Sequence, residues 1–109
     1  KDSENSEAVR DRVIKSRQIQ EIRFKDVEGV YCNAQMSTKQ MRAYAQIDKA
    51  GSDLLKNAMQ RLNLSARAYD RIIKVGRTIA DLDGSENILS NHLAEAINYR
   101  NLDREGWAG

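Results

Sequence analysis

The sequence predicts an all-α fold, a compact bundle of four to five helices. The 109 residues contain no proline and only six glycines, and residues that favour helix dominate the rest. Apolar residues recur at helical spacing in several segments, and no segment makes a convincing strand. A chain of this length supports one domain with a modest core. We therefore expect a single helical domain over residues 1–109.

The first helix is predicted from Ser6 to about Phe24. Ser6 can act as its N-cap, and Glu7 suits the first turn. Its apolar stripe is expected to face the core and consists of Val9, Val13, Ile14, Ile19 and Ile22. In the loop that follows, we expect Val30, Tyr31 and Cys32 to turn inward.

Two helices are predicted in the middle of the chain. Ser37 and Gln40 have the spacing of a capping box, which starts a short helix. Asp48 or Ser52 then starts a longer helix that reaches Leu62. Its apolar positions recur every three to four residues, as expected for a helix that packs on one side.

The helix after Ser65 is the best defined. Its inner face is predicted to comprise Tyr69, Ile72, Ile73, Gly76, Ile79 and Ala80, and its other face Arg67, Arg71, Lys74 and Thr78. A glycine inside a helix costs about 1 kcal/mol relative to alanine. We therefore expect another backbone to approach closely at Gly76.

The final helix is predicted to start at Ser90, after a turn at residues 83–85. Its inward residues are expected to be Leu93, Ala94, Ile97 and Leu102.

Charge and cysteine content limit the class of protein. The net charge is +2, and residues 29–64 are basic whereas the part from Asp83 onward is acidic; solvated helix faces explain this mild polarity. A single cysteine excludes an internal disulfide and favours a cytoplasmic location. No apolar run is long enough for a membrane span. Because the chain starts without methionine, we interpret it as a fragment of a larger protein.

The motifs of a free-standing enzyme are missing. No phosphate-binding loop of the type GxxxxGK[ST] is present, so the fragment alone is not expected to hydrolyse or bind a nucleotide. His92 and Glu95 are three residues apart but lack further ligands, so no metal site is predicted. Cys32 has no base partner and is interpreted as a small buried hydrophobic residue.

A helical module that binds DNA or protein remains an alternative. Helices with basic faces and short connections could place one helix in a DNA groove. The connection at residues 81–86, DLDGSE, is acidic and would repel phosphates. Direct DNA binding is therefore the weaker interpretation.

Arg67 is the most informative position. It follows Ser65 by two residues, in the first turn of a helix, where a cation costs about 0.3–1 kcal/mol. An arginine beside free backbone N–H groups makes a strong site for an anion such as a phosphate. The alternative is an ordinary surface arginine. Arg77 lies further along the helix, away from its N-terminus, and is expected to matter much less than Arg67 for such a site.

The run NLSARAYDRIIKVGRTIADLDGSENILSNHLAEAINYR resembles the C-terminal helical domain of magnesium-chelatase-like AAA+ ATPases, specifically the ComM/YifB branch. SEAVRDRVIKSRQIQEIRF and CNAQM resemble upstream segments of the same branch. The resemblance covers about residues 6–104 and leaves the tail 105–109 unmatched. Gly76 in VGRT stands where the branch is expected to have alanine.

The resemblance implies that this domain is the lid of an ATPase whose core binds ATP and Mg²⁺. It assigns Arg67 as the sensor arginine on the γ-phosphate, with Arg71 a weaker candidate for that phosphate or for a neighbouring subunit. The implied partners are the protein's own core and neighbouring subunits of a ring, expected to be a hexamer. The branch is associated with DNA processing and competence in bacteria. The lid of a true magnesium chelatase subunit is the alternative within this class.

Overall fold

The computed structural model describes residues 6–102, with side chains up to residue 99. This part of the chain contains five α-helices and one short 3₁₀ helix, so the all-α prediction is confirmed. The elements are α1 (Ser6–Arg23), η1 (Asn33–Gln35), α2 (Thr38–Tyr44), α3 (Lys49–Leu62), α4 (Ala66–Leu82) and α5 (Ser90–Leu102). The only strand-like pairing in residues 6–102 is an isolated bridge between Ile47 and Ile88.

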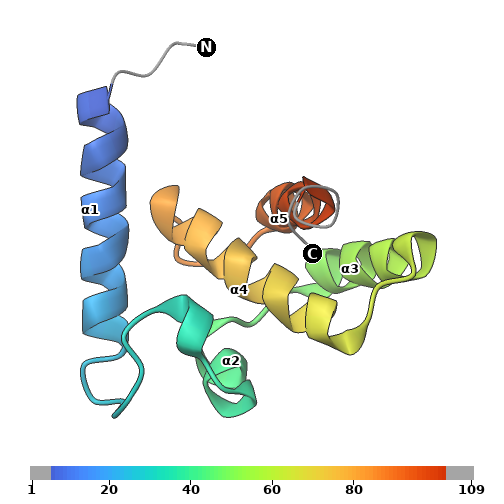
Figure 1. Ribbon diagram of the computed structural model, residues 1–109, viewed down its shortest axis with the longest axis horizontal. Coiled ribbons are helices and arrows are strands. Elements are labelled where there is room, and N and C mark those ends of the chain that lie inside the picture. Colours follow the sequence, from blue (N-terminus) through green and yellow to red (C-terminus); the bar gives the residue numbers. More distant parts are fainter. Residues whose placement is uncertain (1–5, 103–109) are drawn as a thin grey trace.

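Helix α4 crosses the middle of the molecule and contacts α1, η1 and α5, while α3 packs against α5 (Figure 1). The core lies between these helices, and its most deeply buried large apolar residues are Leu55, Ile72, Ile88 and Leu93. Phe24, just after α1, packs edge-on against Tyr44 at the end of α2, with ring centroids 5.6 Å apart. Helix α4 is therefore the central element, against which α1, η1 and α5 pack.

Side-chain caps set the starts of three helices, as the sequence predicts. Ser37 and Gln40 form the complete capping box of α2. Asp48 is the N-cap of α3, where its carboxylate accepts a hydrogen bond from the backbone of Gly51 at 2.8 Å. Ser65 caps α4. Each cap satisfies a backbone N–H that has no partner within its helix.

Helix α1 departs from the expectation for its packing face. Its two buried residues are polar, Ser16 and Gln20, whereas Ile22 is 70% exposed. The other apolar positions are also exposed at Val9, Val13 and Ile14 and half-buried at Ile19. The predicted apolar stripe was therefore wrong, because hydrogen bonds to the rest of the domain, and not apolar contacts, decide which side of α1 is covered.

Leu93 of α5 occupies a notch made by two glycines on two other helices. A Cβ at Gly76 of α4 would lie 2.9 Å from Leu93 Cδ2, and a Cβ at Gly51 of α3 would lie 2.8 Å from Leu93 Cδ1. The close neighbour of Gly76 is thus a side chain, and the expected backbone approach was wrong. Both glycines make room for a single leucine.

The remaining expectations for burial are met in part. Val30 is buried and Cys32 half-buried, but Tyr31 is 75% exposed. On α5, Leu93 and Ile97 face the core as predicted, whereas Ala94 is exposed and Ala96 is buried in its place. The side chain of Leu102 and the tail 105–109 lie outside the described residues. Among the described helices, none combines the length and apolar character needed to cross a membrane.

Candidate functional site

The candidate site lies at the N-terminus of α4. Helix α3 ends at Asn63, which adopts the left-handed conformation (φ 54°) and so lets the chain turn sharply. Ser65 follows in an extended conformation, and its hydroxyl accepts a hydrogen bond from Ala68 N at 3.2 Å. The prediction that Ser65 fixes the start of this helix is confirmed.

Arg67 is the second residue of α4, and its side chain is exposed. Arg71, one turn further on, is also exposed and has a contact of its own within the domain. Arg67 has no side-chain partner among residues 6–102. The structure therefore leaves the Arg67 guanidinium available to a group outside the domain, while its role and that of Arg71 stay predictions.

A buried carboxylate at the other end of α4 fixes the helix against α1. Asp81 is 2% exposed, and Arg23 of α1 forms two hydrogen bonds to its two carboxylate oxygens, each 2.8 Å long. Arg77 lies 3.1 Å from the same carboxylate. Two guanidinium groups thus share one buried acid, an arrangement that needs close geometry to offset the loss of hydration.

Asn33 completes this cluster from the loop between α1 and α2. Its side-chain amide donates to Asp81 at 2.9 Å and to Thr78 at 3.1 Å, and its carbonyl oxygen accepts from Arg23 at 2.8 Å. Its backbone N–H donates to Gln20 of α1 at 2.9 Å. Sequence reasoning missed these roles. Only the presence of an asparagine in the short CNAQM loop hinted at them.

Arg77 is a buried residue that connects several parts of the fold. It is 4% exposed, and its guanidinium donates to the backbone carbonyls of Tyr44, Ser85 and Glu86 at 3.0–3.2 Å. Burial lowers the pKa of Arg77; the nearby carboxylate of Asp81 opposes this effect, and Arg23 adds to it. This one side chain ties α4 to α2 and to the turn before α5. That Arg77 matters less than Arg67 for activity stays a prediction.

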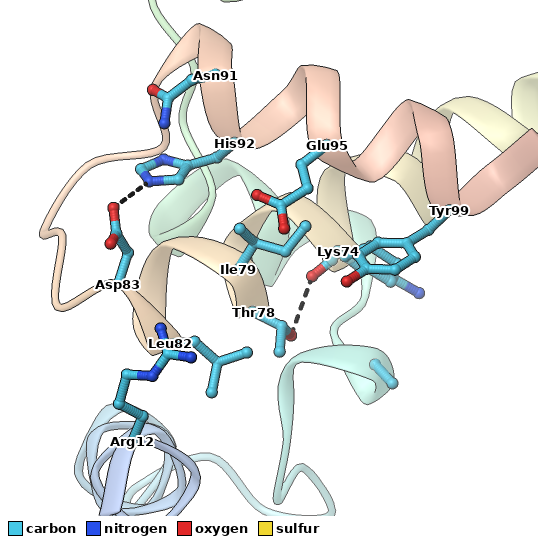
Figure 2. A pocket seen from close by; sticks show the side chains of 12 residues that line it. Arg12, Lys74, Thr78, Ile79, Leu82, Asp83, Asn91, His92, Glu95 and Tyr99 are labelled. Carbon is cyan, nitrogen blue, oxygen red and sulfur yellow. Dashed lines mark hydrogen bonds and ion pairs between the residues drawn. The ribbon is translucent and has the colours of Figure 1, made fainter. Parts of the chain in front are cut away.

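His92 is a helix-capping residue buried at 1% exposure. Its Nδ1 accepts the backbone N–H of Leu89 at 2.9 Å, so the ring proton lies on Nε2 and is donated to Asp83 at 3.0 Å (Figure 2). No cluster of three or more potential metal ligands occurs within residues 6–102. Both ring nitrogens of His92 thus form hydrogen bonds with residues that precede α5.

A pocket of about 510 Å³ opens between α1, α4 and α5 (Figure 2). Its walls carry both charge signs and several apolar groups, and they include Arg12, Lys74, Leu82, Asp83, Glu95 and Tyr99. This pocket does not include Arg67. The two features lie toward different ends of α4.

The described residues form an all-helical domain in which an exposed arginine lies in the first turn of the capped helix α4. The family model described as magnesium chelatase, subunit ChlI C-terminal, matches residues 3–100. The chain belongs to this family.

Curated relatives agree with this assignment. The chain is 41% identical over 101 residues to competence protein ComM of Haemophilus influenzae, and 37% identical to the uncharacterized protein YifB of Escherichia coli. YifB of Salmonella typhimurium is 35% identical over the same length. Each match covers 93% of this chain but only 19% of the relative. The chain therefore corresponds to about a fifth of those proteins.

Proposed function

We propose that this domain is the lid of a magnesium-chelatase-like AAA+ ATPase and closes over ATP held by the core of its parent chain. Family membership supports this proposal, and the observation that carries it is Arg67. Its cationic side chain is exposed in the first turn of α4, where the helix dipole disfavours it, and lacks a partner among the described residues. A γ-phosphate bound by the core would give Arg67 an anionic partner and would offset its unfavourable interaction with the helix dipole.

In this proposal, Arg67 stabilises charge that develops on the phosphoryl group during transfer, as arginines do in other ATPases. Arg71 serves the same phosphate or a neighbouring subunit. ATP and Mg²⁺ are bound by the parent and not by this domain alone. The parent works in the cytoplasm as a ring, with its own core and adjacent subunits as partners.

We further propose that the parent is a DNA-processing motor, since one relative is a competence protein. The alternative within the family is the lid of a magnesium chelatase subunit. A third alternative is a free-standing module that binds DNA or protein. A phosphate-binding loop in the parent sequence would exclude this module and leave the DNA-processing motor and the magnesium chelatase subunit.

The test is Arg67→Ala in the full-length parent. We expect ATP turnover to fall at least about tenfold, which corresponds to about 1.4 kcal/mol of transition-state stabilisation. Arg67→Lys should rescue poorly, because a point charge does not reproduce the planar guanidinium. Steady-state ATPase assays measure both variants.

Arg17→Ala provides the matched control, because Arg17 is an exposed arginine on α1. This variant should retain parental turnover. If Arg67→Ala also hydrolyses ATP at the parental rate, Arg67 is an ordinary surface residue and the sensor role fails.

A further inference from the structure

The pocket between α1, α4 and α5 exposes apolar side chains from two helices. Its α4 wall includes Val75, Ile79 and Leu82. Leu82 is half-buried, yet it does not join the apolar core formed by the described residues. On the α5 side, Tyr99 is 50% exposed. The volume of about 510 Å³ falls within the range of roughly 300–1,000 Å³ of pockets that hold a bound group, so a large aromatic side chain fits.

One end of this pocket lies close to the end of α5. Figure 2 shows Tyr99 and Lys74 toward one end of the pocket and Asp83 toward the other. Helix α5 ends at Leu102, less than one helical turn after Tyr99. The chain therefore leaves α5 beside the end of the pocket that contains Tyr99 and Lys74.

The chain continues after α5 with the sequence DREGWAG, residues 103–109. These residues lie outside both the described part of the chain and the part that the family model matches. Trp107 follows Leu102 by five residues, so an extended segment carries it up to about 17 Å from the end of α5. The distance along α5 from Leu102 back to Asn91, at the far end of the pocket, is about 16 Å. Trp107 can therefore reach along the pocket.

The chemistry of this segment suits the walls of the pocket. A tryptophan supplies a large apolar surface and one N–H donor, and the carboxylate of Glu95 in the pocket wall can accept that hydrogen bond. Asp103 and Glu105 come soon after α5 and are complementary in charge to Lys74 at the near end of the pocket. A polyanion fits less well, because acidic side chains also line the pocket.

We propose that residues 103–109 of this chain bind in the pocket between α1, α4 and α5, with Trp107 packed against Leu82 and Tyr99. Burial of a tryptophan removes about 150–250 Å² of surface from water. Because the segment is part of the same chain, its effective concentration at the pocket is high. The bound segment connects α5 to α4 and, through Arg12 in the pocket wall, to α1.

Fluorescence of Trp107 in the 109-residue chain tests this proposal. The chain has a core of its own between Phe24 and Ile97, and Trp107 is its only tryptophan. Leu82→Gln places a polar side chain in the apolar wall. If the segment is unbound for at most about a tenth of the time, acrylamide should quench Trp107 at least about threefold less efficiently in the unsubstituted chain than in Leu82→Gln.

Leu82 precedes Trp107 by 25 residues, so a change in quenching reports contact through space. Equal quenching in Leu82→Gln and the unsubstituted chain would overturn the proposal, since the segment is then either free or bound elsewhere. Far-UV circular dichroism shows whether the variant keeps its helices. If Leu82→Gln unfolds, Lys74→Glu decides instead: it repels Asp103 and Glu105, and unchanged quenching in this variant would overturn the proposal.

Leu89→Gln is the matched control. Leu89 is 43% exposed and does not line the pocket, so this variant should keep the quenching of the unsubstituted chain. A rise equal to that in Leu82→Gln would indicate general loosening of the domain and overturn the proposal. Protection of Trp107 that disappears on dilution would place the segment in the pocket of a second copy, which also overturns it.

Discussion

Individual polar residues in this domain hold distant parts of the chain together. Asp81 receives hydrogen bonds from Arg23, 58 positions away, and from Asn33, 48 positions away. Its third partner, Arg77, lies one turn earlier on the same helix. Because the acid is buried, its two cationic partners depend on it for compensation of their charge.

Asp81→Asn should therefore lower the free energy of unfolding by about 3–5 kcal/mol, since the amide leaves two guanidinium groups near an uncharged partner. Urea denaturation followed by circular dichroism measures this change. Asp53→Asn is the control, because the Lys49–Asp53 pair is exposed and 3.3 Å apart; an exposed pair contributes about 0–1 kcal/mol. Similar losses in both variants would contradict the central role of Asp81.

Among elements, α5 shows how a helix start can be set by an unexpected residue. Ser90 is the first helical residue, but His92 supplies the acceptor for the N–H of Leu89. The imidazole thus takes the place of the glutamate or glutamine side chain that, in a capping box, reaches back to the backbone N–H of the N-cap residue.

His92→Ala should destabilise the domain by at least about 2 kcal/mol, because it removes the acceptor and leaves a buried void. Ser90→Ala should change the free energy of unfolding by less than about 0.5 kcal/mol, as expected for an exposed position without such a role. Thermal or urea unfolding of both variants compares them directly. A larger loss for Ser90→Ala would show that the serine caps α5.

Contact between elements depends on the glycine notches around Leu93. Gly76→Ala alone should change stability by less than about 1 kcal/mol, because Leu93 can shift toward Gly51 and the helix gains propensity. Gly51→Ala plus Gly76→Ala closes both notches and should cost about 1–3 kcal/mol. A double-mutant cycle should give a coupling of at least about 0.5 kcal/mol. Simple additivity would show that Leu93 is not confined between the two helices.

At the scale of the whole molecule, the proposed function gives this domain one side of a nucleotide site. Arg67 is exposed, and the chain has no phosphate-binding loop to hold the rest of ATP. The 109-residue chain should therefore fold, show no ATPase activity and bind ATP no better than about millimolar, which corresponds to about −4 kcal/mol. Isothermal titration calorimetry measures the affinity. Micromolar binding would contradict the lid assignment.

The sequence by itself determined the helices and several of their starts. Ser37, Asp48 and Ser65 act on N–H groups three residues away, so their effect depends on local chain geometry alone. The inner face of α4 was also predictable, because its apolar residues follow one helical period and pack against apolar neighbours. Arg67 could be placed on α4 for the same local reason.

Only the tertiary structure decided which side of α1 is buried and which polar residues form the Asp81 cluster. A buried polar group is stable when a partner compensates its lost hydration, and the partners of Asp81 come from Arg23 and Asn33, far along the chain. The chosen side of α1 carries Ser16 and Gln20, and hydrophobic periodicity does not identify such a polar face. Local sequence therefore specifies where helices form, whereas the requirement to satisfy buried charges and hydrogen bonds specifies how they meet.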